Sequence, residues 1–142
     1  MRKIGIIAVL SLIALAIAVV PALAAKPGAH EQKKDTITCT VVNNGTQVQC
    51  TGTVSGLGNV TTANTEVLAD FACSTKPAKN NPPGHLQGDS GPLQVTNGSL
   101  TFDVTTGPAT CPPGLVPTIG DTATVNIFNG STLLYTTTVP IT

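Results

Sequence analysis

The chain has 142 residues, with seven basic and seven acidic side chains, and is only 10% charged and 3% aromatic. This length suits one domain and not two. Because the chain has no basic stripe and no polybasic patch, the composition excludes nucleic-acid binding and anionic-lipid binding as expected functions.

The first 24 residues have the pattern of a secretory signal peptide. Two basic residues at 2–3 precede an apolar run over 4–20, and Pro21 ends that run. Small residues at 22 and 24 suit signal peptidase, so we expect cleavage before Ala25. The alternative is an uncleaved anchor, since the run is at the short end for a spanning helix. With cleavage, we expect a secreted protein, extracellular or associated with the cell surface, without stable membrane insertion.

After the signal, residues 25–35 are charged and without periodicity, which predicts a flexible leader before a single domain over 36–142. The domain is rich in threonine, with 23 Thr in the whole chain. Threonine is β-branched and favours half-exposed strand positions, so composition already favours a sheet.

Four cysteines follow the signal, and an even number in a small exported domain predicts two disulfides. Their spacing is too wide for a zinc site, and we expect no metal and no cofactor. The four are Cys39, Cys50, Cys73 and Cys111.

Alternating residues around Asn43-Asn44-Gly45-Thr46 predict a hairpin in which Ile37, Cys39 and Val41 share one face. Facing residues then sum to 89, which places Cys39 opposite Cys50. A four-residue loop makes them a non-hydrogen-bonded pair, close enough for a disulfide. We therefore expect bridges Cys39–Cys50 and Cys73–Cys111, the second tying a strand to a Pro-rich loop.

Two further Asn-Gly pairs predict two more hairpins. Around Asn97-Gly98, facing residues sum to 195, so that Val95 faces Leu100 and Leu93 faces Phe102. Around Asn129-Gly130 they sum to 259, so that Val125 faces Leu134. Apolar residues meet in both registers, as a correct register requires.

A longer strand is expected over Val60–Cys73, with odd-numbered residues from Thr65 facing inward and Glu66 and Asp70 outward. Ser74–Gly91 and Thr106–Gly120 are rich in Pro and Gly and predict long loops between sheets. The fold class expected is all-β, an antiparallel sandwich of about seven strands with immunoglobulin-like architecture and two disulfides. The chain has no Trp, so only the architecture is expected.

One short motif, Gly88-Asp89-Ser90-Gly91-Pro92, resembles the sequence around the nucleophile of chymotrypsin-like proteases. That family needs a distant His and a buried Asp to activate the Ser, and the mature chain offers only His30 in the leader and His85 close by. The motif therefore predicts a polar turn, not a nucleophile.

Four glycosylation sequons occur, three of them in the predicted hairpin turns, where Asn-Gly is ordinary turn chemistry. Their use depends on the host, which the sequence does not show. The sequons begin at Asn44, Asn59, Asn97 and Asn129.

No nucleophile–base pair, metal site or cofactor loop is recognisable, so we expect no enzyme activity. The sequence favours a non-catalytic structural, adhesive or interaction role toward an unidentified protein or surface glycan, with strand-edge self-association a candidate because Lys is scarce on the strands. The alternative is a small carbohydrate- or ligand-binding module using Phe128 and Tyr135 as a shared aromatic face.

Overall fold

The computed structural model describes residues 28–31, 36–75 and 83–142, and over these residues the protein consists of β-strands without helices. Nothing there is a helix long and apolar enough to cross a membrane. The expected signal peptide lies outside the described residues. The strands are β1 (His30–Glu31), β2 (Thr38–Val42), β3 (Gln47–Ser55), β4 (Thr62–Ser74), β5 (Pro83–Gln94), β6 (Leu100–Thr105), β7 (Val116–Asn129) and β8 (Thr132–Pro140).

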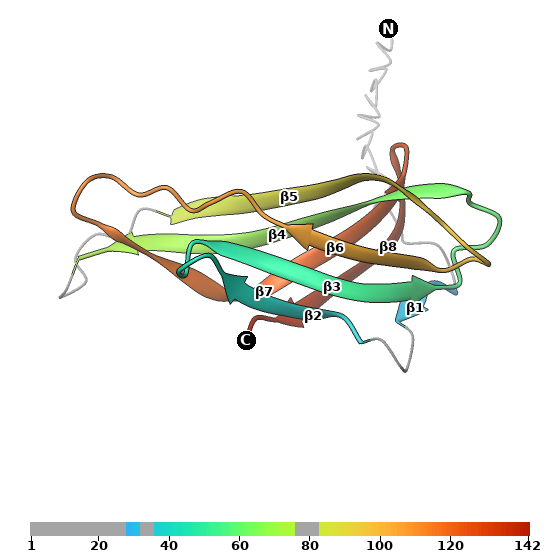
Figure 1. Cartoon of the computed structure of the whole chain (residues 1–142), viewed down its shortest axis with the longest axis horizontal. Coiled ribbons are helices and arrows are strands. Elements are labelled where there is room, and N and C mark those ends of the chain that lie inside the picture. The colour runs from blue at the N-terminus through green and yellow to red at the C-terminus, as the bar shows by residue number, and fades with distance from the viewer. Residues whose placement is uncertain (1–27, 32–35, 76–82) are drawn as a thin grey trace, which may run out of the picture.

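The strands form two antiparallel sheets stacked on one another (Figure 1). In the first sheet, β3 is central, with β6 along one edge and both β1 and β2 along the other. The second sheet has the order β5-β4-β7-β8. Strand β1 lies within the expected leader 25–35, and its two residues, His30 and Glu31, pair with Ser55 and Val54 of β3.

The core lies between the sheets and is built from alternate residues of each strand, as period-two alternation predicts. The inward face of β4 is as expected, with Thr65 and Val67 fully buried. Val41 differs from the prediction, because it lies near the end of β2 and remains 40% exposed. The largest fully buried side chains are Leu57, Leu100, Ile127, Val48, Val54, Val67 and Val125.

The first hairpin is confirmed in register and in loop length. Residues 43–46 form the loop, Cys39 pairs with Cys50, and a disulfide joins them with the Cα atoms 4.1 Å apart. Asn43, Asn44 and Gly45 all have positive φ, which explains why Asn and Gly occupy this loop. The second disulfide joins Cys73 to Cys111, which is the pairing expected.

The prediction of the second hairpin is wrong beyond its turn. Thr96 and Ser99 exchange two backbone hydrogen bonds of 2.9 Å around Asn97-Gly98, but β5 then pairs with β4 and β6 pairs with β3. Leu93 therefore does not face Phe102 in a ladder. The turn residues fix only two positions, whereas each strand gains a long ladder by joining a different sheet.

The third hairpin joins the expected strands in a different register. Asn129 pairs with Thr132 around Gly130-Ser131, and Val125 faces Thr137 instead of Leu134. Gly130 has φ of 59° at the first position of this two-residue turn, where glycine is favoured. A bulge near Phe128 then shifts the register by one more residue and places Leu134 in the core.

Two predicted loops are partly strands. Pro83–Gln94 forms β5 and Val116–Gly120 forms the beginning of β7, so the loop predictions over Ser74–Gly91 and Thr106–Gly120 are wrong there. Strand β5 lies at an edge of its sheet, where a residue without an N–H is tolerated. Its Pro and Gly content therefore does not prevent pairing with β4.

The two sheets are joined at one side by the C-terminus. Thr142 donates to the Cys39 carbonyl at 2.9 Å and accepts from Val41 N–H at 3.1 Å, parallel to β2. Cys39 can make this contact because a residue in a non-hydrogen-bonded pair directs its backbone groups away from the partner strand. On the other side, Gly107 donates to the Gln87 carbonyl of β5 at 2.9 Å.

Candidate interaction surface

The outer surface of the second sheet carries a continuous set of polar side chains with one apolar member, Leu68, and we call this set the polar face. It is formed where the outward residues of β4, β5 and β7 meet in register. Its members are Glu66, Leu68, Asp70, His85, Gln87, Thr122, Thr124 and Asn126.

Glu66 is the centre of a hydrogen-bond ladder on the polar face. Gln87 Nε2 donates to Glu66 Oε1 at 2.8 Å, and Asn126 Nδ2 donates to Glu66 Oε2 at 3.1 Å. Thr136 Oγ1 of β8 in turn donates to Asn126 Oδ1 at 2.7 Å. The ladder crosses all four strands, so these side chains are held in fixed orientations instead of moving independently in solvent.

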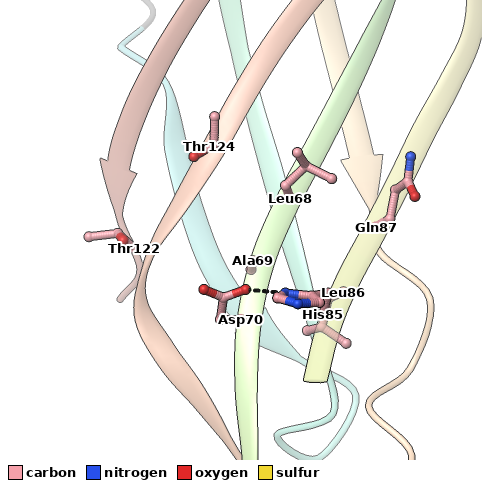
Figure 2. Close-up of a pocket in the computed structure, with 8 residues that line it drawn as sticks. All are labelled: Leu68, Ala69, Asp70, His85, Leu86, Gln87, Thr122 and Thr124. Carbon is pink, nitrogen blue, oxygen red and sulfur yellow. Dashed lines mark hydrogen bonds and ion pairs between the residues drawn. The ribbon is translucent and has the colours of Figure 1, made fainter. Parts of the chain in front are cut away.

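Asp70 and His85 form a hydrogen-bonded pair across β4 and β5, with Asp70 Oδ1 2.6 Å from His85 Nδ1 (Figure 2). The two side chains are 78% and 84% exposed. An exposed pair of this kind contributes little to stability. Its effect is to orient the Asp70 carboxylate at the surface.

Beside this pair lies a shallow depression of about 390 Å³, with Leu68, Gln87, Thr122 and Thr124 around it (Figure 2). Its shape follows from a bulge. Ala69 and Phe71 of β4 pair with residues 123 and 119 of β7. Only Asp70 lies between the two positions on β4, whereas three residues, 120–122, lie between them on β7. A bulge bends the strand that carries the extra residues, and bulges are frequent beside functional sites.

The protease-like motif lies inside β5 and not in a turn, so the polar turn predicted there is wrong. Ser90 and Gly91 are the extra residues of a second bulge opposite Thr65, and Gly91 has φ of 66°. Ser90 Oγ accepts from Thr65 N–H at 2.9 Å and donates to the Gly91 carbonyl at 2.7 Å. His85 is five residues away on the same strand, roughly 16 Å at about 3.3 Å per residue. The Ser90 hydroxyl therefore stabilises the backbone of this bulge through its two hydrogen bonds.

The expected aromatic face does not form. Tyr135 pairs with the buried Ile127 and packs against the core, and its hydroxyl donates to Glu31 Oε1 of the other sheet at 3.3 Å. Phe128 follows Ile127 along β7 and pairs with Asn64, so alternation places it on the outer surface. Phe128 and Tyr135 thus lie on opposite sides of their sheet.

The four sequon asparagines are all exposed, at Asn44, Asn59, Asn97 and Asn129. The last differs from the others because its Nδ2 donates to the Thr62 carbonyl at 2.7 Å. That bond fixes the β7–β8 turn against the start of β4.

Over the described residues, no group of three or more His, Cys, Asp or Glu side chains is arranged to hold a metal ion. The chain matches no family model, no curated protein and no solved structure.

The sequence prediction missed the polar face because β5 was expected to be a loop. A signal was available in the alternation of His85, Gln87 and Asp89 around the buried Leu86. A single apolar residue between glycines and prolines is a weak strand pattern. The pattern alone therefore does not predict that this segment pairs with the strand that carries Glu66 and Asp70.

Proposed function

We propose that this protein is a secreted, disulfide-stabilised, immunoglobulin-like β-sandwich that acts as a non-catalytic interaction domain outside the cell or at its surface. The observation that carries the proposal is the polar face, where a hydrogen-bonded ladder holds polar side chains beside a depression. A side chain fixed before binding loses less conformational entropy when a partner binds, which favours recognition.

The strand order supports the immunoglobulin-like architecture. In that architecture the first, second and fifth strands form one sheet, and the third, sixth and seventh lie together in the other. Counting from β2, the same positions hold here, with β2-β3-β6 facing β4-β7-β8. The difference from the constant-type arrangement is β5, which joins β4 and not β6.

The predicted signal peptide and the two disulfides support secretion, because structural disulfides persist in oxidising compartments. Intact-mass measurement of protein from the culture medium should give a chain that begins at Ala25. Recovery of only the full-length chain, in the membrane fraction, would contradict secretion and support the uncleaved anchor.

The interaction role is tested with the purified secreted protein in a solid-phase screen against extracellular proteins and surface glycans, together with its oligomeric state. Thr124→Arg places a long charged side chain in the depression, whereas Thr40→Arg changes an exposed residue of β2 in the other sheet. We expect a genuine partner to be lost by T124R and retained by T40R. A partner that is unaffected by T124R would show that the polar face is not the binding surface.

A further inference from the structure

Carboxylate side chains gather on the outward residues of β4 and β5. All seven Lys and Arg residues of the chain lie within 1–27, 32–35 and 76–82, so the described part has none. It does carry six carboxylates, and three of them, Glu66, Asp70 and Asp89, are on the outward residues of β4 and β5. Among the described residues, the polar face and its border therefore carry three carboxylates and one basic side chain, His85.

We propose that the polar face docks a lysine-bearing segment of a partner polypeptide, with the lysine side chain in the depression and its ammonium group at Asp70. This deepens the proposed interaction role and rests on it. Charge complementarity decides the class of partner: the carboxylates of this face attract a cationic side chain and repel nucleic acid and anionic lipid.

The depression has the two kinds of surface that a lysine side chain needs. Leu68 offers an apolar contact for the four-carbon stem, and Asp70 lies two residues further along β4, roughly 6.6 Å at about 3.3 Å per residue. Thr122 and Thr124 on β7 and Gln87 on β5 also line the depression, and polar side chains of this kind suit an ammonium group with three donors. Figure 2 shows these side chains on three adjacent strands.

The state of Asp70 favours lysine over arginine. Its Oδ1 is already bonded to His85 Nδ1 at 2.6 Å, so among the described residues only Oδ2 is left for a partner. An arginine fork binds a carboxylate best through both oxygens, whereas a lysine ammonium acts as a point charge and needs only one. Glu66 does not offer an alternative fork site, because both of its oxygens accept from amides.

The test measures the binding of fluorescein-labelled decalysine, decaarginine and decaglutamate peptides to the secreted protein by anisotropy at low ionic strength. We expect decalysine to bind more tightly than decaarginine, and decaglutamate not to bind. Asp70→Asn should weaken decalysine binding by about fivefold or more, as the loss of one charge-assisted hydrogen bond predicts.

The matched control is Asp103→Asn. Asp103 is an exposed carboxylate on the other sheet and, like Asp70, has one side-chain hydrogen-bond partner, Gln49 Nε2 at 2.7 Å. The Asp103→Asn substitution should weaken decalysine binding by less than about twofold, because it removes the same charge from a different surface. Thr124→Arg, which retains every carboxylate, should abolish the preference for decalysine, and thermal unfolding of each variant verifies the fold.

Three results would overturn the proposal: no binding of decalysine, equal losses for D70N and D103N, or tighter binding of decaarginine. If these occur while the solid-phase screen still gives a partner that T124R eliminates, the interaction role stands and the lysine assignment fails. If the screen gives no such partner and decalysine binding depends on Asp103 as much as on Asp70, both proposals fail.

Discussion

Thr65 is a polar residue at the centre of the apolar core. It is fully buried on the inner face of β4, and its hydroxyl has no hydrogen-bond partner among the described residues. Thr106 is also buried, but its Oγ1 accepts from Val48 N–H at 3.0 Å. The same side chain therefore has opposite energetic consequences at the two positions, since an unpaired buried hydroxyl is costly and a paired one is not.

We expect Thr65→Val to raise the free energy of unfolding by about 1 kcal/mol, because it removes an unsatisfied hydroxyl with little change of shape. Thr106→Val should lower it by about 1–3 kcal/mol, since the buried Val48 N–H loses its acceptor. Urea unfolding of both variants measures the two changes. A loss of stability in T65V would show that its hydroxyl is satisfied in solution.

Tyr135 is the only tyrosine of the chain, which also lacks Trp, so its ionisation can be followed directly by near-ultraviolet absorbance. Burial raises the pKa of its phenol above the ordinary value, and the nearby Glu31 carboxylate adds to this increase. The neutral phenol is thus favoured in the folded state. Its contribution to stability is complete below about pH 10 and decreases as the pH rises through the folded-state pKa.

We expect the Tyr135 titration midpoint to lie above that of the unfolded chain in denaturant. Glu31→Gln should lower the midpoint without returning it fully to the unfolded value, because burial remains. Tyr135→Phe should remove part of the alkaline loss of stability. A folded midpoint equal to the unfolded one would contradict the packing of this ring against the core.

Pairing between the elements depends on close approaches that only glycine allows. Gly84 of β5 pairs with Phe71 of β4, and a Cβ at Gly84 would lie 2.2 Å from Phe71 Cζ. Gly84→Ala should therefore displace the ring and lower the free energy of unfolding by about 1–3 kcal/mol. Gly107→Ala is the control, since its Cβ would meet only the Gln87 carbonyl oxygen, at 3.8 Å. Thermal unfolding should separate the two, and equal effects would mean that the ring moves freely.

The two disulfides stabilise elements of different kinds. Cys39–Cys50 closes a hairpin that already has five paired residues on each strand. Cys73–Cys111 instead joins the end of β4 to the segment before β7, and these two cysteines are 38 residues apart in sequence. In the chain-entropy model the longer closure contributes about 4 kcal/mol and the shorter about 3 kcal/mol. We expect C73A/C111A to lower the urea midpoint more than C39A/C50A does. The reverse order would indicate that core packing around Cys39 outweighs chain entropy.

On the scale of the whole molecule, stability depends on the seam between the sheets. Removing Ile141 and Thr142 deletes the backbone bonds to Cys39 and Val41 and uncovers the outer edge of β2. We expect a chain ending at Pro140 to lose about 1–3 kcal/mol and to associate with increasing concentration, because an uncovered strand edge pairs with other chains. Urea unfolding and light scattering measure both effects. Thr142→Ala, which retains the backbone, should behave like the unaltered protein.

The sequence by itself determined the all-β class, the first hairpin with its loop length and register, the inward face of β4 and both disulfide partners. These features depend on local alternation, on Asn and Gly at positive φ, and on the arithmetic of one short turn. Such signals act between residues that are near in sequence or that face each other directly across one loop, and Cys73–Cys111 follows because only these two cysteines remain once Cys39 is paired with Cys50.

Only the tertiary structure decided which strands share a sheet. The turn at Asn97-Gly98 is local, but β5 and β6 separate after it, β5 pairing with β4 in one sheet and β6 with β3 in the other. That choice brings His85 and Gln87 to Asp70 and Glu66, and the bulge opposite Asp70 opens the depression beside them. The physical reason is that ladder energy is summed over residues distant in sequence, so no single turn or local pattern reveals which partner a strand selects.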